Sequence, residues 1–159
     1  MKASINTSVL ITFGKLGYLR LFSRLFDELF VAGSVLEEVR GSEVYAEVER
    51  MIDVGFASVS EASRRELLDV LSSSLGRGEA EAIAVASDVD ADIVLLDDLR
   101  ARRMARRLGL NVMGTLGVLK ALIDMGLIEV SPEDLCRTLI EQGFWIDREL
   151  CIEILSGNN

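Results

Sequence analysis

The sequence predicts an α/β fold in which a parallel β-sheet lies between helices, with extra helices at the C-terminus. Short apolar runs alternate with segments whose apolar residues recur every three or four positions, a pattern typical of parallel sheets flanked by helices. The chain of 159 residues is 50% hydrophobic and 27% charged, and it is long enough to bury a sizeable core. It contains no linker, repeat or low-complexity segment, so we predict a single domain over residues 1–159.

In the first part of the chain, three strands alternate with helices. Strands are expected at residues 3–5, in the run LFVAG and, more weakly, in GFASVS. A helix with an aromatic and leucine face is expected between Tyr18 and Phe26. The segment SVLEEVRG forms a short helix in which Ser34 is the N-cap and Glu37 completes a capping box.

The second part continues the alternation and then becomes helical. A leucine-rich helix leads to the glycine turn LGRG, followed by the helix EAEAIAVAS, the strand DIVLL, the helix RARRMARRLG and the strand NVMG. Three helices end the chain, in TLGVLKALIDMG, SPEDLCRTLIEQG and DRELCIEIL, and we assign a C-terminal helical extension to residues 131–156. Ser131 as N-cap and Pro132 in the first turn mark the start of this extension.

The absence of histidine narrows the chemistry open to this chain. With no His in the sequence, Ser-His and Cys-His pairs and an imidazole general base are excluded. The phosphate-binding loop pattern GxxxxGK[ST] is also absent. Carboxylates are the main catalytic groups left, and clustered carboxylates repel one another unless a cation holds them together. Mg²⁺ and Mn²⁺ prefer such oxygen ligands.

The chain has no feature of a membrane or secreted protein. No apolar run approaches the ~20 residues of a membrane span, and the N-terminus lacks the pattern of a signal peptide. We therefore expect a cytoplasmic protein that does not associate with membranes. Cys136 and Cys151 lie in helical patterns without histidine partners, so we expect reduced core residues rather than a zinc site or a redox pair.

Two pairs of adjacent acids can be separated by position. Asp97 ends an apolar strand, where sites of open α/β sheets gather, whereas Asp98 is placed to cap the next helix. Glu37 has a structural role in the capping box, and Glu38 has none. These arguments select Asp97 and Glu38 as functional candidates.

Two further glutamates, Glu79 and Glu81, are expected to have different roles because they lie on different faces of one predicted helix. Glu79 lies on the stripe of Ala82, Ile83 and Ala86 that should face the core, where a charge needs a partner such as a metal. The alternative for Glu79 is that it complements the dipole at the helix N-terminus. Glu81 falls on the flank with Asp88, where it can pair with Arg77.

Positive charge is concentrated in one helix of an otherwise acidic protein. The net charge is −9, yet five arginines and two aspartates lie in residues 97–107. One flank of this helix carries Arg100, Arg103 and Arg107, and the other carries Arg102 and Arg106. The first flank can contact phosphate groups of a nucleic acid, or it is an ordinary solvated helix face.

A set of sequence motifs, in the order in which they occur along the chain, resembles the PIN-domain family. The motifs are SINTSVLI, SVLEEV, GEAEAIAVA, IVLLDDLRARRMARRLGL, VMGTLGVLKALIDMGLI and GFWI, and they cover the chain from about Ser4 to Leu155. More narrowly, they resemble a prokaryotic PIN subgroup related to the toxin ribonucleases of toxin–antitoxin pairs. The resemblance implies an Mg²⁺- or Mn²⁺-dependent ribonuclease that attacks an RNA phosphodiester with water. It further implies RNA and an antitoxin protein as partners, and we expect a homodimer.

Carried over by position, the resemblance implies a metal site of Asn6, Glu38, Glu79 and Asp97. The family has an acid where this chain has Asn6, and an amide oxygen can bind a cation but brings no charge. The alternative role of Asn6 is a helix N-cap. This departure favours a second hypothesis, a catalytically weakened PIN-like module that binds RNA or a protein partner. Thr115 is expected to line the RNA site, or to cap the helix that it begins.

Overall fold

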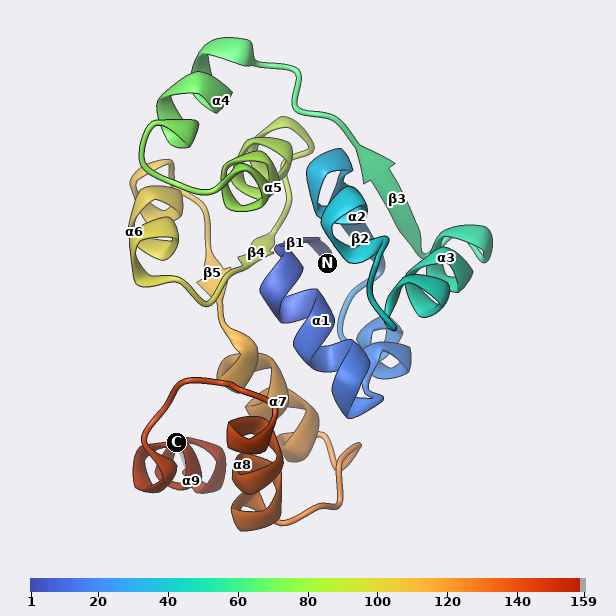
Figure 1. The fold of residues 1–159 in the computed structure, drawn as a ribbon, viewed down its shortest axis with the longest axis vertical. Coiled ribbons are helices and arrows are strands. Elements are labelled where there is room, and N and C mark those ends of the chain that lie inside the picture. The colour runs from blue at the N-terminus through green and yellow to red at the C-terminus, as the bar shows by residue number, and fades with distance from the viewer. Residues whose placement is uncertain (158–159) are drawn as a thin grey trace. The chain divides into compact units, whose positions relative to one another are not determined.

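The computed structural model describes residues 1–157. The chain forms two compact units, Met1–Gly114 and Thr115–Asn159. The described part has no helix of the length and apolar character that crossing a membrane requires. The first unit contains, in chain order, β1 (Lys2–Ile5), α1 (Thr7–Leu16), the 3₁₀ helix η1 (Leu19–Arg24), β2 (Glu28–Ala32), α2 (Gly33–Val39), α3 (Tyr45–Asp53), β3 (Ala57–Ser60), α4 (Arg65–Ser72), α5 (Arg77–Asp88), β4 (Ile93–Leu95), α6 (Leu99–Arg107) and β5 (Val112–Met113) (Figure 1). The second unit contains α7 (Thr115–Asp124), α8 (Pro132–Glu141) and α9 (Arg148–Ser156).

The strands of the first unit form one parallel sheet in the order β3-β2-β1-β4-β5. This confirms the predicted α/β fold. The chain adds β2 and β3 on one side of β1, then crosses over and adds β4 and β5 on the other side. In open parallel sheets, such a reversal between two neighbouring strands opens a crevice at their carboxyl ends, where ligands bind.

The register of β1 and β4 brings polar residues to this crevice. Ile5 pairs with Leu95, and the backbone N–H of Asn6 donates to the carbonyl of Leu95 over 3.1 Å. Asn6 therefore directly follows β1, and Asp97 comes two residues after the end of β4. Both strands are buried in the middle of the sheet, so polar side chains can reach water only where the strands end.

Helix α5 is enclosed on almost all sides. Every residue from Ala80 to Ala86 is buried, and the helix packs against β1, β2, β4, α2 and α4. Small alanine side chains allow the backbone to approach the sheet, and Oγ of Ser4 on β1 donates to the carbonyl of Ala82 over 2.7 Å. A helix in this position has no solvent face along its middle turns.

The segment after β1 differs from the sequence prediction. Helix α1 begins at Thr7 and ends at Leu16, and Gly17 caps it with a φ of 78° that suits glycine. The predicted helix between Tyr18 and Phe26 is instead the short 3₁₀ helix η1. Leu21, Phe22 and Phe26 of the predicted face are buried, whereas Tyr18 and Leu25 are half-buried. The apolar spacing therefore identified most of the buried side chains but not the helix type.

Helix α2 begins differently from the sequence prediction. It starts at Gly33 and has no side-chain cap, so Ser34 lies inside the first turn and the predicted capping box with Glu37 is wrong. The backbone N–H of Ser34 donates instead to Oε1 of Glu81 on α5, over 3.4 Å. A side chain from a packed helix thus supplies the acceptor that was expected from within α2.

In the second unit, α8 starts as predicted, with Oγ of Ser131 accepting the N–H of Asp134 over 3.2 Å. Cys136 on α8 and Cys151 on α9 are both fully buried, as expected, but they form a disulfide with their Cα atoms 6.0 Å apart. The prediction of reduced thiols was wrong. Whether two cysteines meet depends on how their helices pack, which their spacing in sequence does not show.

Candidate functional site

Asn6 lies at the carboxyl end of β1 and caps α1. Its side chain is only 5% exposed. Its Oδ1 accepts the N–H of Thr7 over 2.7 Å, and its Nδ2 donates to Oγ of Ser8 over 3.4 Å. The N-cap role considered from the sequence is therefore confirmed. An amide oxygen has two lone pairs, so the cap leaves one of them for a metal ion or a substrate group.

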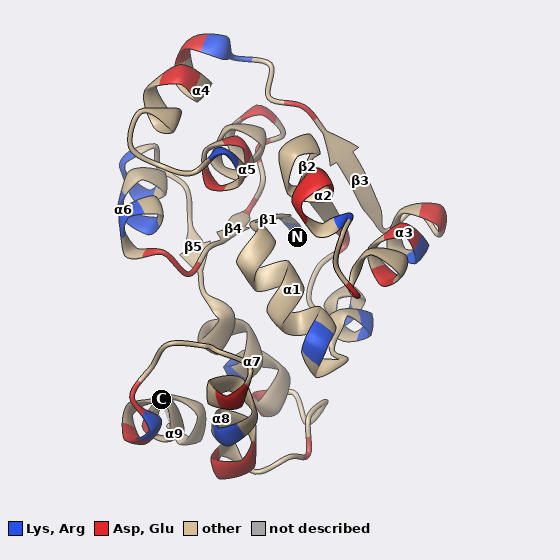
Figure 2. Cartoon of the chain, viewed as in Figure 1, with Lys and Arg blue, Asp and Glu red and all other residues tan. Residues whose placement is uncertain are grey.

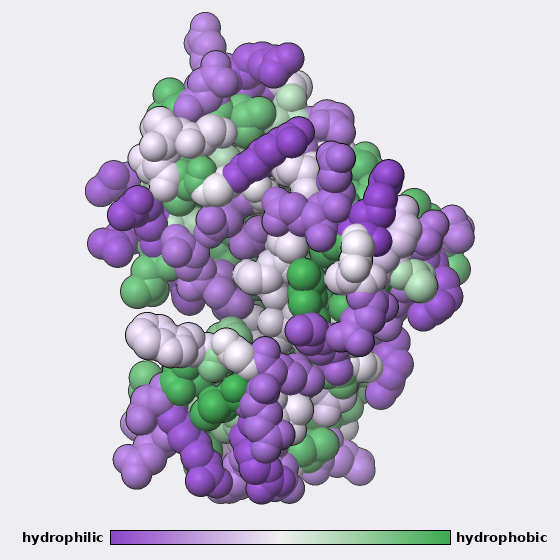
Figure 3. All heavy atoms as spheres, in the orientation of Figure 1, coloured by the Kyte–Doolittle hydropathy of each residue, from purple (hydrophilic) through white to green (hydrophobic). Residues whose placement is uncertain are grey.

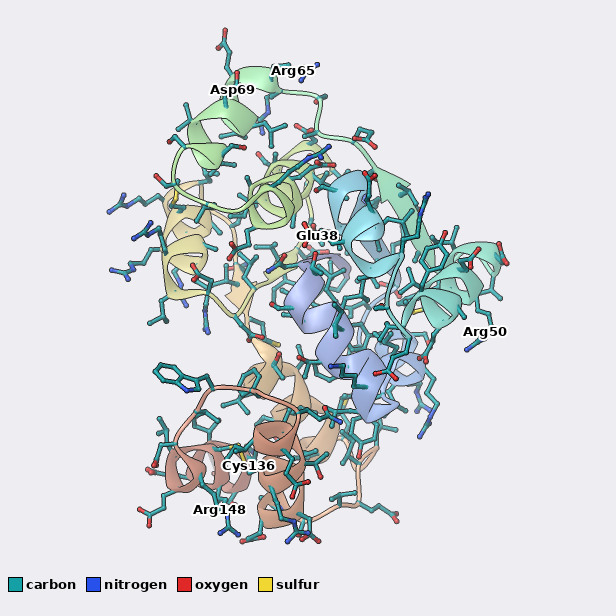
Figure 4. All side chains as sticks on the ribbon, in the orientation of Figure 1. Glu38, Arg50, Arg65, Asp69, Cys136 and Arg148 are labelled. Carbon is teal, nitrogen blue, oxygen red and sulfur yellow. A yellow bond between two sulfur atoms is a disulfide. The ribbon has the colours of Figure 1, made fainter. Side chains whose placement is uncertain are left out.

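Glu38 projects from α2 toward the starts of α5 and α1 (Figure 4). A methyl group on Gly78 would lie 2.5 Å from Oε1 of Glu38 and 3.2 Å from Oγ1 of Thr7, so both oxygens adjoin the space that this glycine leaves open. Oγ1 of Thr7 is buried and has no hydrogen-bond partner. An unpaired buried hydroxyl is costly, and a cation beside Glu38 would give it a partner. Sequence reasoning did not select Thr7, although it directly follows Asn6.

Glu79 is half-buried in the first turn of α5. Burial raises the pKa of its carboxyl group, and the negative charges of Asp98 and Glu38 raise it further, while a hydrogen bond from the backbone of Gly76 acts in the opposite direction. Glu79 therefore lies close enough to both acids for their charges to disfavour its ionised form. A cation among these carboxylates would remove that repulsion.

Glu81 is the more deeply buried glutamate of α5, with 4% of its surface exposed. Its placement on an outer flank with Asp88 and Arg77 was wrong. Asp88 instead pairs with Arg64 at 3.2 Å and accepts the N–H of Ser63 at 2.6 Å. The assignment of faces failed because α5 is enclosed on almost all sides, so a single apolar stripe does not define its interior face.

Asp97 and Asp98 have separate surroundings. Oδ1 of Asp98 accepts the N–H of Ala101 over 2.9 Å and caps α6, as predicted. Asp97 is half-buried, and a methyl group on Gly114 would lie 2.9 Å from its Oδ1 and 3.0 Å from Nη1 of Arg102. Arg102 therefore lies beside this acid. Helical spacing had assigned Arg102 only to the second flank of α6.

Helix α6 carries several basic residues, and the surface over it is mostly hydrophilic (Figures 2 and 3). Arg100, Arg103 and Arg107 are all exposed, which agrees both with phosphate contact and with a solvated helix face. Thr115 begins α7 in the second unit and is fully buried. Contact of these four residues with RNA stays a prediction.

The predicted metal ligands make two sets of contacts in the first unit. In one, Glu38 faces Thr7, which follows Asn6, and the charge of Glu38 acts on Glu79. In the other, Asp97 adjoins Arg102. Within residues 1–157, no group of three or more Cys, Asp or Glu side chains is arranged to hold a metal ion. The donors are hard oxygens that suit Mg²⁺ or Mn²⁺, and the unpaired hydroxyl of Thr7 fits such an ion.

Comparison with known proteins agrees with the fold. A family described as a PIN domain has a sequence model that matches residues 3–159. None of the curated proteins compared with the chain matches it. PIN domains are in general nucleases that depend on a divalent metal and act on nucleic acid, so the match indicates a nuclease-type function. Because the match spans nearly the whole chain and the structure has the expected parallel sheet, the chain belongs to the PIN-domain family.

Proposed function

We propose that the protein is a ribonuclease that uses Mg²⁺ or Mn²⁺ to hydrolyse RNA phosphodiesters. The observation that carries the proposal is the pair of oxygens at Gly78, where the carboxylate of Glu38 and the unpaired hydroxyl of Thr7 adjoin one space. They lie in the part of a parallel sheet where α/β proteins bind ligands. A site of oxygen donors without histidine is suited to a hard divalent cation and poorly suited to zinc.

In this proposal, Asn6, Glu38, Glu79 and Asp97 hold the metal. When bound, such an ion lowers the pKa of water and neutralises charge on phosphate oxygens. Glu79 needs to be ionised to bind the metal, and its raised pKa means that it binds most strongly once the pH has passed that raised value. Asn6 contributes an oxygen without charge, while its cap of α1 keeps Thr7 at the start of the helix.

The positively charged helix α6 supplies the RNA contacts. Arg100, Arg103 and Arg107 would bind backbone phosphates, which holds RNA without reading its sequence. The acidic remainder of the protein would limit non-specific binding of nucleic acid.

A second candidate function is a non-catalytic module that binds RNA or a protein partner. Asn6 favours it, because the family has an acid there and because the amide oxygen of Asn6 already accepts the N–H of Thr7. The lack of a group of three acids arranged for a metal within residues 1–157 favours it as well. We further propose that the protein is a cytoplasmic homodimer, and that, as a ribonuclease, it is the toxin half of a pair with an antitoxin protein.

The direct test is cleavage of single-stranded RNA by the purified protein with Mn²⁺, with Mg²⁺ and with a chelator. We expect cleavage with either metal and none with the chelator. A Glu38→Gln variant should lose cleavage, whereas Glu37→Gln, which changes the exposed neighbouring glutamate, should keep it. RNA binding without cleavage under every condition would support the non-catalytic module instead.

A further inference from the structure

Arg102 differs from the other arginines of α6. It is half-buried, whereas Arg100, Arg103, Arg106 and Arg107 are exposed. Its Nε is buried and has no hydrogen-bond partner. Leaving this N–H unpaired is costly, because Nε has lost contact with water and gained no partner in return. Such a donor is available to an anionic ligand.

The guanidinium of Arg102 is located at the candidate site. Its Nη1 and Oδ1 of Asp97 lie 3.0 Å and 2.9 Å from the position that a methyl group on Gly114 would occupy, so both atoms border the same small space. Asp98, between Asp97 and the helix, caps α6 through the N–H of Ala101 and holds the first turn in place. A side chain on Gly114 would require a shift of the acid or of the arginine.

We propose that Arg102 and its surroundings form a phosphate subsite beside Asp97, occupied by a phosphate group of the RNA backbone. This inference rests on the proposed ribonuclease function and assigns to Arg102 a role that we had given only to the exposed flank. Guanidinium groups bind phosphate through two parallel N–H donors, and a small rotation of the Arg102 group would bring Nε and one Nη onto the same phosphate. The unpaired Nε–H would then gain its partner in the complex.

Arg102 would act as a fixed positive charge and not as a proton donor, because guanidinium groups stay protonated. Its position next to Asp97 would place the phosphate at the carboxyl end of β4, beside the acids proposed to hold the metal. The charge would attract the phosphate and oppose the repulsion that the nearby carboxylates exert on it. The exposed arginines of α6 would then bind phosphates in the rest of the RNA strand.

The test compares Arg102→Ala and Arg102→Lys with Arg106→Ala, a matched control on the same helix that is exposed and outside the proposed site. RNA affinity is measured by fluorescence anisotropy with a labelled single-stranded RNA in Ca²⁺, over a series of salt concentrations. Cleavage is measured with Mn²⁺, and melting temperature with and without Mn²⁺. Arg102→Ala should weaken binding about 10- to 100-fold, the loss typical of one charge-assisted pair of hydrogen bonds.

The salt dependence separates charge from geometry. Arg102→Ala should reduce the slope of log affinity against log salt by about one, whereas Arg102→Lys should keep the slope but lose most of the affinity and cleavage, because lysine lacks the planar pair of donors. Arg106→Ala should stay within about twofold of the native protein in affinity. Arg102→Ala should retain the gain in melting temperature with Mn²⁺, because Arg102 binds phosphate and not the metal.

Each of the other outcomes overturns the inference. Suppose that the native protein binds and cleaves RNA, but Arg102→Ala has the same RNA affinity and cleavage rate as Arg106→Ala. The phosphate subsite is then wrong, while the proposed function stands. If Arg102→Ala loses the increase in melting temperature with Mn²⁺ but keeps the native affinity for RNA, Arg102 positions Asp97 and binds no phosphate. If Arg102→Ala does not fold, native-like affinity in Arg102→Lys still contradicts the paired-donor contact. If the native protein has no affinity for RNA, the inference and the proposed function both fail.

Discussion

The carboxylate of Glu38 occupies the space that a side chain on Gly78 would need. A methyl group at that glycine would lie 2.5 Å from Oε1 of Glu38, well inside the distance at which non-bonded atoms attract. The glycine near the start of α5 therefore sets how closely the acid from α2 can approach this helix. It also leaves Oγ1 of Thr7 beside the same space.

Replacing Gly78 by alanine should separate function from stability. Alanine favours the helical conformation by about 1 kcal/mol over glycine, but its methyl group should push Glu38 away from Thr7. We expect Gly78→Ala to melt close to the native protein in chelator and to lose most of the increase in melting temperature that Mn²⁺ produces. Gly41→Ala is the control, because a methyl group there would contact nothing within 4 Å. An undiminished Mn²⁺ response in Gly78→Ala would show that this space is not part of a metal site.

The raised pKa of Glu79 makes stability depend on pH. Burial and the charges of Asp98 and Glu38 favour the protonated carboxyl group in the folded state. Below about pH 4 the group is protonated in both folded and unfolded chains, and the penalty for its charge is absent. As the pH rises through the raised pKa, the folded state has to hold the charge and its free energy of unfolding falls.

Glu79→Gln should remove this fall in the free energy of unfolding with rising pH. Urea unfolding in chelator should show little difference from the native protein at low pH and a stability advantage for Glu79→Gln that grows with pH and then levels off. Mn²⁺ should reduce or reverse the advantage, because the charged form is then the one that the site needs. Glu37→Gln should show no such trend, since this side chain is exposed. A constant difference between Glu79→Gln and the native protein at all pH values would contradict the assignment.

Replacing Asn6 by aspartate distinguishes the two candidate functions. Aspartate caps helices as well as asparagine does, so the start of α1 should be preserved. In chelator the added charge should lower the melting temperature through repulsion by the neighbouring acids. Addition of Mn²⁺ should raise the melting temperature of Asn6→Asp by more than it raises that of the native protein, because a ligand bound only by the folded state stabilises that state.

Cleavage by Asn6→Asp then decides between the hypotheses. Faster RNA cleavage with tighter metal binding supports the ribonuclease, whereas tighter binding without cleavage supports the non-catalytic module. Asn6→Ala, which removes both the cap and the amide oxygen, should be less stable by about 1 kcal/mol in chelator. If the Mn²⁺ response of Asn6→Asp equals that of the native protein, Asn6 does not take part in the metal site.

The disulfide should account for much of the stability of the second unit. Cys136 and Cys151 are 15 residues apart, and closing a loop of this length lowers the entropy of the unfolded chain by an amount worth about 3 kcal/mol. Urea unfolding followed by circular dichroism should show this loss on addition of a reductant. The double variant Cys136→Ala and Cys151→Ala should not respond to the reductant. Equal stability of the native protein with and without reductant would mean that the thiols are not bonded.

Three helix caps and the buried strands could be predicted from the sequence alone, although the capping box expected at Ser34 was wrong. Asn6, Asp98 and Ser131 each cap the helix that follows them, and each bond is made to a backbone N–H within three residues. Such interactions depend on local backbone geometry and on nothing beyond the neighbouring turn. Apolar runs likewise marked the buried strands, because a strand in the middle of a parallel sheet is covered on both faces.

Contacts between elements were decided only by the tertiary structure. The burial of Glu81 against Ser34, the position of Arg102 beside Asp97 and the disulfide each join segments that are distant in sequence or lie on faces that helical spacing could not rank. A periodic pattern states which side chains share a helix face. It does not state which neighbour covers that face, because the packing of helices depends on the shapes of all the surfaces that meet.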